Sequence, residues 1–401
     1  MKPFGALISY PKAKEIINEH VQPIKRTEFV PIDEATNRVL ASDLIAIVTV
    51  PPFNRAAMDG YAVKAKDTFG AGQFKPKIFK IIGEVRAGEE PGKKIKSGEC
   101  LQISTGAVMP GGADAVIMVE DTERDNENVK VFKSITPNSN IGKMGEDIRE
   151  GSVILKAGSC LDAGKVGVLA SQGLAKVKVY EKPRVAVVPT GEEVIPAGKK
   201  LKPGQLYDIN SHTISSVVKV NGGVPTRIGI AGDKTEDLKT IIKEALKNDI
   251  LVFSGGSSVG EHDLLVEVIE GWGEILFHGV QVKPGKPTMF AMIEGKPLIG
   301  MPGYPTSCLI NSYLLLAPAL RKMARLPLRN DNIIQAKLAQ RVPGTTGRRQ
   351  FLTVKLVGGE AVSVFKESGA ITSIADADGY IEIPENIDLL EKGMTVTVTL
   401  F

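Results

Sequence analysis

The sequence is poor in the residues that build disulfide frameworks and structural metal sites. Its 401 residues include only three cysteines, Cys100, Cys160 and Cys308, and no two of them have Cys-x-x-Cys spacing. The four histidines also lack the spacing of metal ligands. Disulfide-rich secreted domains and zinc modules depend on such patterns, so we expect the chain to belong to neither class.

Long apolar runs and blocks of one charge sign are also missing. The most apolar stretch, residues 309–320, contains three helix-breaking or polar residues and is too short to cross a bilayer. Residues 1–10 lack a basic segment followed by an apolar core, so no signal peptide is expected. The 50 basic and 46 acidic residues are mixed along the chain and give a net charge of +4. We therefore expect a cytoplasmic protein that binds neither nucleic acid nor membrane.

The length and the residue pattern predict an α/β protein of several domains. Helical spacing near residues 13–20 is followed by short, glycine-punctuated, strand-like segments from about 30 to 131. Small and apolar residues between 142 and 173 suggest a return to a helical region. We interpret residues 1–45 and 141–180 as a discontinuous helical or mixed domain, and residues 46–140 as a mostly β domain.

From residue 182 onward, strand-like and helical segments alternate. Such alternation predicts a mostly parallel sheet with helices on both faces, and ligands then bind at the carboxyl ends of its strands. We assign residues 181–326 to this domain and residues 327–401, where strand patterns return, to a C-terminal β-domain. The expected strands are 185–188, 227–230, 250–253 and 297–301, and the expected helices are 211–221, 235–247 and 305–324.

A glycine-rich loop at residues 254–263 joins a buried strand to a helix. Gly255, Gly256 and Gly260 can adopt positive φ and expose backbone N–H groups to an anion, and Ser258 adds a hydroxyl donor. Glycine can also serve only to turn the chain. The combination with two further loops of similar chemistry favours a phosphorylated ligand.

The two further loops follow later strands of the same domain. Lys283 and Lys286 lie in a proline-stiffened loop and suit phosphate or another oxyanion, although an exposed Lys-Pro loop can serve no ligand at all. Residues 302–307 open a helix at Pro305, where Ser307 presents a hydroxyl at the positive end. Arg348 and Arg349 could add guanidinium contacts or lie on a surface hairpin. Pro302 and Pro305 are counted among the expected ligand-binding residues.

Carboxylates accompany several of the turn motifs. They are Asp59, Asp147, Glu193, Asp233 and Asp263. If phosphates occupy the loops, nearby carboxylates would repel them unless a cation intervenes, and Mg²⁺ is the natural bridge. Taken singly, each carboxylate is more often a cap, a turn residue or a solvated charge. Their juxtaposition is what would support a metal site.

Eight motifs in one order resemble the molybdopterin molybdenumtransferase family, whose members insert molybdenum in the last step of molybdenum-cofactor synthesis. The resemblance implies an elongated homodimer with a discontinuous first domain, a mostly β second domain, a nucleotide-handling third domain and a C-terminal β-barrel. The active cleft would lie between the third domain of one subunit and the second domain of its partner. The motifs lie at residues 51–62, 104–107, 111–116, 145–149, 190–193, 254–263, 283–287 and 302–305.

The resemblance also implies an activity. Such an enzyme takes adenylylated molybdopterin and molybdate, cleaves the linkage to AMP with Mg²⁺ present, and leaves molybdenum on the dithiolene; it can also contact the upstream adenylyltransferase transiently. Asp59 and Thr105 would reach in from the partner subunit. The other implied roles are Asp147 in catalysis, Glu193, Asp233 and Asp263 on metal and nucleotide, and Lys283, Lys286, Ser307 and Arg348 or Arg349 on molybdate.

The chain departs from the family pattern at three positions, and two other functions remain open. Tyr304 replaces a usual asparagine, Ser257 stands where an apolar residue is common, and Gln350 replaces a carboxylate. Tungstate matches molybdate in charge and nearly in size, so a tungsten-inserting variant is an alternative. The other functions are an adenylyltransferase acting one step earlier, which would lack residues 51–62 and the terminal β-domain, and a non-catalytic scaffold of the same fold.

Overall fold

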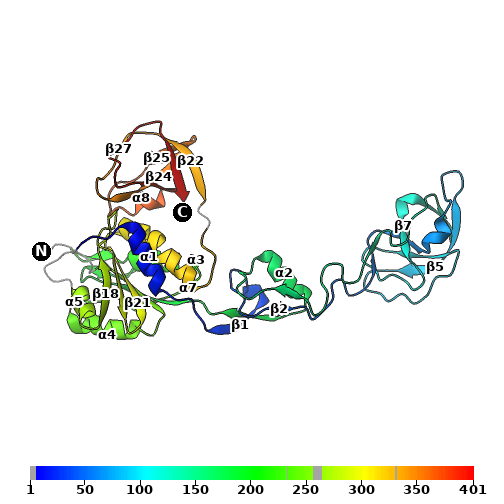
Figure 1. The fold of residues 1–401 in the computed structure, drawn as a ribbon, viewed down its shortest axis with the longest axis horizontal. Coiled ribbons are helices and arrows are strands. Elements are labelled where there is room, and N and C mark those ends of the chain that lie inside the picture. The colour runs from blue at the N-terminus through cyan, green and yellow to red at the C-terminus, as the bar shows by residue number, and fades with distance from the viewer. Residues whose placement is uncertain (1–5, 233, 256–263, 330–331) are drawn as a thin grey trace. The chain divides into compact units, whose positions relative to one another are not determined.

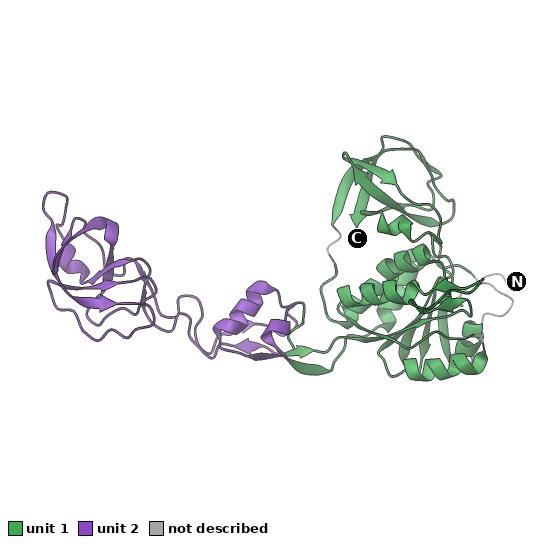
Figure 2. Cartoon of the chain, turned by 180° about the vertical axis from the view of Figure 1, so that it is seen from behind, with its two compact units in different colours: residues 1–29, 37–41, 178–401 green, residues 30–36, 42–177 purple. Residues whose placement is uncertain are grey.

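The computed structural model describes residues 6–232, 234–255, 264–329 and 332–401, and it divides into two compact units. Unit 1 contains residues 1–29, 37–41 and 178–401, and unit 2 contains residues 30–36 and 42–177 (Figure 2). The finer division into four domains remains a prediction. Each unit is described by itself.

The largest sheet of unit 1 has six strands in the order β16-β13-β17-β21-β20-β18. The first four are parallel, which confirms the expected mostly parallel sheet, although the strand expected at 227–230 lies three residues earlier, at 224–227. β20 runs antiparallel to its neighbours β21 and β18, and the sequence pattern revealed neither β20 nor β18. The strands are β13 (Arg184–Pro189), β16 (Val224–Arg227), β17 (Ile250–Ser254), β18 (Gly273–His278), β20 (Met289–Ile293) and β21 (Lys296–Met301).

Helices cover both faces of this sheet (Figure 1). Val185 and Val187 point into a core shared with α1, α3, α6 and α7, whereas Ala186 and Val188 point into a core shared with α4 and α5. Because successive strand residues face opposite sides, both faces demand apolar residues, and the strands read as continuous apolar runs. The helices are α1 (Tyr10–His20), α3 (Asn210–Val220), α4 (Thr235–Ala245), α5 (Leu264–Glu270), α6 (Pro305–Asn311) and α7 (Ala317–Met323).

The expected helix over residues 305–324 is interrupted in the middle. A π-helical segment, η4 (Ser312–Leu316), separates α6 from α7. Pro318 at the start of α7 has no backbone N–H, so the regular hydrogen-bond ladder cannot continue through it. The wider turn accommodates this gap without ending the helical run.

The C-terminal part of unit 1 is a small β-barrel, as expected. Its sheet order is β19-β24-β25-β22-β28-β26, and an additional β24–β26 pairing closes the five strands after β19. Residues such as Leu338, Val354 and Ile383 fill its core. The elements are β19 (Val282–Lys283), β22 (Ile333–Leu338), β24 (Arg349–Val357), β25 (Glu360–Ser363), β26 (Gly379–Ile383) and β28 (Thr395–Leu400), with β23 (Val342–Pro343), β27 (Leu389–Leu390) and α8 (Thr372–Ala375) beside them.

Unit 2 is mostly β, which agrees with the expectation of a mostly β domain in this part of the chain. Its main sheet has the order β7-β4-β6-β5-β9-β8. Residues 142–173, expected to be helical, are helical only at α2 (Ala163–Ser171). The sheet strands are β4 (Gly60–Val63), β5 (Lys77–Val85), β6 (Glu99–Ile103), β7 (Ala115–Met118), β8 (Thr122–Asp125) and β9 (Asn128–Val131).

Paired short strands and 3-10 turns complete unit 2 and the segments between the units. The antiparallel pairs are β2 with β11 and β3 with β10. These elements are β1 (Thr27–Pro31), β2 (Leu44–Ile45), β3 (Arg55–Ala56), β10 (Ile141–Gly142), β11 (Val153–Leu155), β12 (Lys176–Tyr180), η1 (Ile32–Glu34), η2 (Ala65–Thr68) and η3 (Val119–Asp121).

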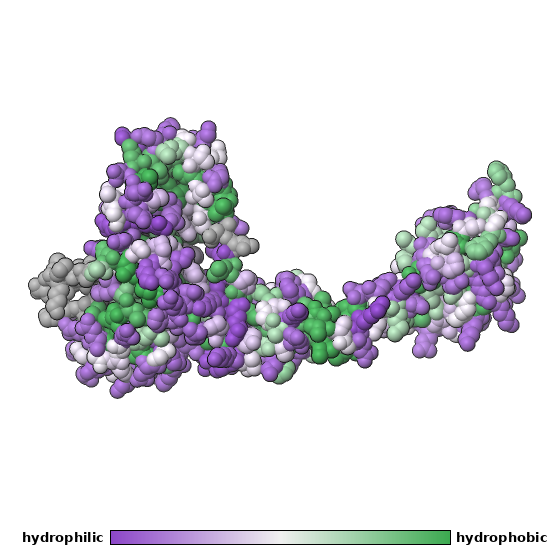
Figure 3. Space-filling model, viewed as in Figure 1, coloured by the Kyte–Doolittle hydropathy of each residue, from purple (hydrophilic) through white to green (hydrophobic). Residues whose placement is uncertain are grey.

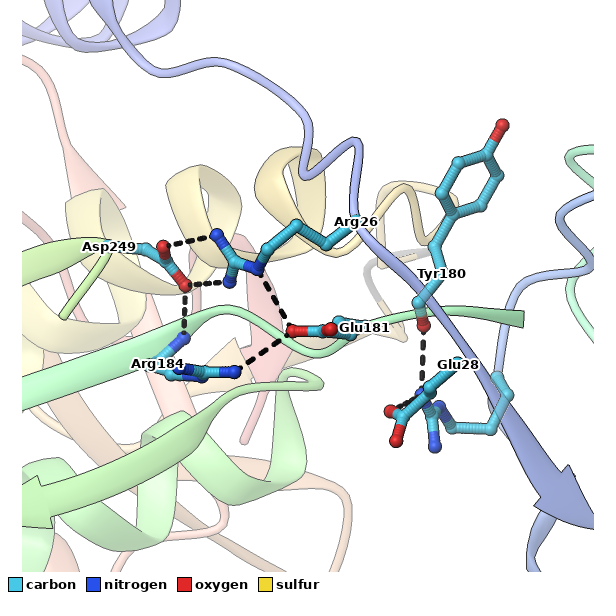
Figure 4. A network of polar contacts seen from close by, with 7 residues as sticks. Arg26, Glu28, Tyr180, Glu181, Arg184 and Asp249 are labelled. Atoms are coloured by element: carbon cyan, nitrogen blue, oxygen red, sulfur yellow. Dashed lines mark hydrogen bonds and ion pairs between the residues drawn. The ribbon is translucent and has the colours of Figure 1, made fainter. Parts of the chain in front are cut away.

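A polar network in unit 1 joins the segment before β1 to the segment after β12 (Figure 4). The Arg26 guanidinium donates to both carboxylate oxygens of Asp249, at 2.9 and 2.8 Å, and to Glu181 at 2.9 Å. The backbone N–H of Arg184 also donates to Asp249, at 2.8 Å. Burial alone would raise the pKa of Asp249, but the hydrogen bonds from Arg26 and Arg184 outweigh it and lower that pKa.

The visible surface carries no continuous apolar belt. Figure 3 shows hydrophilic and hydrophobic side chains mixed over most of the face in view, with a local apolar patch in unit 2. The neighbouring residues Ile45, Ile47 and Val48 are exposed, as is Val153, which pairs with Ile45. In the described part of the chain, no helix combines the length and the apolarity needed to cross a membrane.

Candidate functional site

Three loops of unit 1 begin side by side at the carboxyl edge of the parallel strands. The register pairs Pro189 with Ser254, and Ser254 with Met301. The N–H of Thr190 donates to Ser254 at 2.9 Å, and the N–H of Gly255 donates to Met301 at 3.1 Å. The loops after β13, β17 and β21 therefore meet at the edge where ligands of such sheets bind.

A cavity of about 1080 Å³ opens at this edge. The sheet loops, the lysine loop, the start of α3 and two segments of the C-terminal barrel contribute its walls. Gly256, Ser258, Gly260 and Asp263 lie outside the described residues. The polar and conformationally special lining residues are Thr190, Gly191, Glu193, Asp208, Asn210, Ser254, Gly255, Lys283, Gly285, Lys286, Pro302, Gly303, Tyr304, Pro305, Ser307, Arg348, Ser368 and Gly369.

Gly255 is required by its conformation and by its neighbours. Its φ is +92°, and a Cβ atom there would lie 2.7 Å from Thr190 Oγ1 and 2.9 Å from the Thr190 carbonyl oxygen. A side chain would separate the first two loops. The close approach of backbones thus depends on glycine at this position.

The lysine loop is held against α6 by Asn311. The Asn311 amide donates to the carbonyl oxygens of Ser307, at 2.8 Å, and Pro284, at 3.3 Å. Gly285 has φ +106°, and a Cβ atom on it would lie 1.7 Å from the Asn311 amide nitrogen. The half-buried Lys283 donates from Nζ to Thr345 Oγ1 at 3.0 Å. These contacts hold the backbone of the loop that carries Lys283 and Lys286.

The two arginines that the sequence could not distinguish have different surroundings. Arg348 lines the cavity. Arg349 pairs instead with Glu382 at 2.9 Å and with Glu385 at 3.1 Å, and it does not line this cavity. The structure thus places only Arg348 with the two lysines.

The helix that starts at Pro305 brings a hydroxyl and an aromatic ring to the cavity. Ser307 is only 4% exposed and lines the wall, whereas Tyr304 is 68% exposed at the rim, with its ring beside Gly369. The Thr306 hydroxyl donates to the Ala370 carbonyl oxygen at 2.8 Å. Burial raises the pKa of the Cys308 thiol to about 12, so this thiol stays protonated and is no nucleophile.

Two buried lining residues carry polar atoms without a partner in the portion that the structure describes: Ser254, which begins the expected glycine-rich loop, and Asn210, which sequence reasoning missed. Ser254 is 2% exposed and Asn210 is 9% exposed, and neither Ser254 Oγ nor Asn210 Oδ1 has a hydrogen-bond partner among the described residues. The Asn210 amide nitrogen donates to the Gly303 carbonyl oxygen at 2.8 Å, and the amide oxygen Oδ1 takes no part in this hydrogen bond. Asp208 caps α3 by accepting from the N–H of Ser211 at 2.9 Å. The sequence did offer a signal for this part of the site, namely the polar residues at the start of a helix that follows a strand.

The expected metal ligands are only partly described. Glu193 is exposed and lines the cavity, just before the short parallel pair β14 (Val194–Ile195) and β15 (Leu206–Tyr207). Asp233 and Asp263 lie outside the described residues. Over the remainder of the chain, no three His, Cys, Asp or Glu side chains converge on a point that could hold a metal ion.

Unit 2 carries the other expected residues. Asp59 Oδ1 accepts a hydrogen bond from the backbone N–H of Thr105 at 2.8 Å, and both residues are exposed. Asp147 is exposed in a separate turn, where its N–H donates to Val50. The structure therefore joins Asp59 to Thr105 and places Asp147 in another loop of the same unit.

The fold and the cavity define an α/β protein with a cavity lined by cationic residues beside a parallel sheet and with two further β-rich regions. Family models match nearly all of the chain: the MoeA N-terminal region (domain I and II) at residues 8–173, a probable molybdopterin binding domain at 186–322 and the MoeA C-terminal region (domain IV) at 335–401. The chain therefore belongs to the MoeA family, as its motifs predicted.

Relatives extend over the full length. A Staphylococcus aureus protein named molybdopterin molybdenumtransferase is 33% identical, with 92% of this chain and 90% of that protein covered. A Methanocaldococcus jannaschii protein named for molybdopterin biosynthesis is 36% identical, with 96% and 95% covered. A crystal structure of a molybdopterin biosynthesis MoeA protein from Pyrococcus horikosii has a TM-score of 0.85 and 44% identity, with 98% and 99% covered.

Proposed function

We propose that the chain is a magnesium-dependent molybdopterin molybdenumtransferase that takes adenylylated molybdopterin and molybdate, releases AMP and leaves the metal on the dithiolene. Membership of the MoeA family makes it a transferase of molybdenum-cofactor biosynthesis. Three parts of the proposal are argued from the site: the use of Mg²⁺, the release of AMP and the roles of individual residues.

The convergence of three cationic side chains in one cavity carries the proposal. Lys283, Lys286 and Arg348 line the same cavity as the loops that begin at the ends of parallel strands. A tetrahedral oxyanion and a phosphoanhydride both carry negative charge that fixed cationic donors stabilise best, especially as charge grows on the leaving phosphate. Ser307 adds a hydroxyl to the same cavity.

The buried polar atoms support a ligand with its own hydrogen-bonding groups. Ser254 Oγ can donate or accept, and Asn210 Oδ1 can accept while its amide is held by Gly303. Buried polar atoms in native proteins are normally satisfied. A phosphate oxygen or ring nitrogen of the substrate would accept from Ser254 Oγ, and a sugar hydroxyl or ring N–H would donate to Asn210 Oδ1.

Magnesium fits the chemistry of the donors assigned to it. Mg²⁺ prefers carboxylate, water and phosphate oxygens, and Glu193 brings one carboxylate to the cavity. We assign Asp233 and Asp263 as the other two protein ligands. Bound there, the ion would neutralise charge on the phosphate that leaves with AMP. The protein residues around it bind and orient the substrate.

We further propose that two copies of the chain share the cleft. Asp59 and Thr105 belong to unit 2 and would reach the cavity of a second copy, and Asp147 would act beside them. The division into residues 1–45 with 141–180, 46–140, 181–326 and 327–401 accompanies this arrangement. A cytoplasmic setting and transient contact with the upstream adenylyltransferase belong to the same proposal, with tungstate as the alternative oxyanion.

The test measures AMP released from adenylylated molybdopterin with Mg²⁺ and with molybdate, tungstate or neither. Release stimulated by an oxyanion is expected, and it should disappear in Lys283→Ala but not in Lys355→Ala, whose side chain is exposed on β24. Absence of release from a folded dimer with either oxyanion would remove the proposed activity. ATP-dependent release of pyrophosphate instead would indicate the adenylyltransferase.

A further inference from the structure

We propose that Thr345 and Gln350 position Lys283, so that its ammonium group is aimed at the oxyanion by a relay that adds no negative charge. The inference rests on the proposed function of the same cavity. It adds two residues of the C-terminal barrel that touch Lys283 rather than the ligand, and it gives them a role in oxyanion affinity.

The pairing of β19 with β24 builds the relay. These strands are parallel, with Val282 opposite Arg349 and Lys283 opposite Gln350. The N–H of Arg349 donates to the Gln281 carbonyl oxygen at 2.9 Å, which fixes the register. Neighbours in a parallel pair extend their side chains to the same face, so Lys283 and Gln350 share one side of the strands.

The chemistry of the three groups fixes the direction of the relay. Lys283 Nζ lies 3.0 Å from Thr345 Oγ1, and Thr345 Oγ1 lies 2.9 Å from Gln350 Oε1. An ammonium group only donates, so the Thr345 oxygen accepts from it and the single hydroxyl hydrogen goes to the amide oxygen of Gln350. Among the described residues, no partner accepts from the other two N–H bonds of Lys283 Nζ, which a ligand could use.

The same turn presents the third cation of the cavity. The N–H of Arg348 donates to the Thr345 carbonyl oxygen at 3.1 Å, and Gly347 between them has φ +77°. Thr345 thus touches Lys283 through its side chain and Arg348 through its backbone. Loss of the hydroxyl removes only the first contact, which makes a side-chain substitution informative.

The neutrality of Gln350 is part of the proposal. Gln350 is 6% exposed, so a charge at this position would be poorly screened by solvent. A carboxylate there would attract the Lys283 ammonium and offset the positive potential that an oxyanion meets. We therefore expect Gln350→Glu to weaken oxyanion binding.

A purely structural role is the alternative, and the adjacent threonine provides the control. The Thr346 hydroxyl donates to Asp388 at 2.6 Å, and Thr346 is exposed and does not line the cavity. Thr345→Val and Thr346→Val remove the same group from neighbouring residues. Thr345→Ser keeps the hydroxyl and should behave as the wild type.

The experiment titrates the full-length protein and these variants with molybdate and with tungstate by isothermal calorimetry, with unfolding temperatures measured in parallel. We expect Thr345→Val to raise Kd about tenfold, the loss typical of one hydrogen bond to a charged group. Thr346→Val and Thr345→Ser should stay within about twofold of wild type on the same scale. The KM for oxyanion in AMP release should rise in Thr345→Val with kcat unchanged.

Two results would overturn the positioning role. One is unchanged oxyanion affinity in Thr345→Val and Gln350→Glu while Lys283→Ala abolishes binding. The other is an equal loss in Thr345→Val and Thr346→Val. A wild-type protein that binds neither oxyanion overturns the proposed function itself and this inference with it, so the two failures are distinguishable.

Discussion

The carboxylate of Asp59 is hydrogen bonded to the backbone N–H of Thr105 across two neighbouring strands, at 2.8 Å. Asp59 directly precedes β4 and Thr105 follows β6, and the register pairs Gly60 with Ile103. A Cβ atom on Gly60 would lie 1.8 Å from the Ile117 carbonyl oxygen, so only glycine fits beside Asp59. The sheet therefore holds this exposed carboxylate in a defined position.

Asp59→Asn should impair the reaction and leave the fold intact. Asparagine keeps an acceptor oxygen for the Thr105 N–H but removes the charge. If the carboxylate acts on the reaction, AMP release in single turnover should fall by about 100-fold or more. Asp125→Asn is the control, since Asp125 is an exposed residue of the same unit whose carboxylate contacts the Asn126 amide at 3.3 Å and Lys130 at 3.7 Å. Equal rates in the two variants would contradict the assignment.

Substitution of Arg348 should weaken oxyanion binding, whereas substitution of Arg349 should lower the free energy of unfolding. Arg348→Ala removes a guanidinium from the cavity and is expected to weaken oxyanion binding by about tenfold. Arg349→Ala breaks the pairs with Glu382 and Glu385, and these partly exposed pairs are worth about 1 kcal/mol of unfolding free energy. Calorimetric titration and denaturant unfolding measure the two effects. Weaker binding in Arg349→Ala alone would reverse the roles.

Tyr304 is expected to act on substrate affinity. Its ring is largely exposed at the cavity rim beside Gly369, so removing it should leave the unfolding temperature unchanged. Tyr304→Ala should raise KM for adenylylated molybdopterin a few-fold, about 1 kcal/mol for one lost aromatic face, with kcat preserved. Tyr304→Phe keeps the ring and serves as the control. A loss in Tyr304→Phe as large as in Tyr304→Ala would assign the effect to the phenol hydroxyl.

The pattern of the sequence was sufficient for the architecture of the parallel sheet. Val185 to Val188 and Ile250 to Phe253 are apolar without alternation because helices cover both faces. Loops after such strands must meet at one edge, so Gly255 and Pro302 could be expected in one site before any coordinates. Lys283 was expected beside them, but it lies on β19, which pairs with β24 of the C-terminal barrel and not with this sheet. The structure places all three in the wall of one cavity.

The remaining features depend on contacts between distant segments. Arg348 and Arg349 are adjacent in sequence, and only the pairing of β19 with β24 sends one to the cavity and the other to Glu382. Thr345 joins the site for the same reason. The strands β18 and β20 were missed because no helix separates β20 from β21, so helix-strand alternation does not reveal this antiparallel end of the sheet. The residue pattern of one segment does not specify the register in which it pairs with a strand far away in the sequence.

Gly285→Ala should disrupt both stability and oxyanion binding. The new Cβ atom would lie 1.7 Å from the Asn311 amide nitrogen, and φ is +106°, so the lysine loop must move. We expect a loss of more than about 3 kcal/mol of unfolding free energy. Gly295→Ala is the matched control, because Gly295 has φ +72° but open space around its Cβ position. It should cost only about 1 kcal/mol, the price of positive φ alone.

Comparing Gly285→Ala with Gly295→Ala separates the cost of a positive φ from the cost of the steric clash with Asn311. Denaturant unfolding gives the two stabilities, and calorimetric titration with molybdate gives the two affinities. Gly295→Ala should bind oxyanion as the wild type does. If the two variants lose equal stability, the contact between Gly285 and Asn311 does not hold the lysine loop in place.

Asp249 should make the stability of unit 1 sensitive to acid. Its pKa is lower in the folded chain than in the unfolded one, so its stabilisation is present above the unfolded pKa of about 3.9 and is lost as pH falls through the folded value. Asp249→Asn should therefore cost about 2 kcal/mol at pH 7 and progressively less below pH of about 4, as the wild-type carboxylate takes up its proton. Thermal unfolding of both proteins across pH 3 to 8 measures the gap, with Asp125→Asn as the exposed control. A gap that stays constant with pH would show that the carboxylate charge does not hold Arg26 and Arg184 in place.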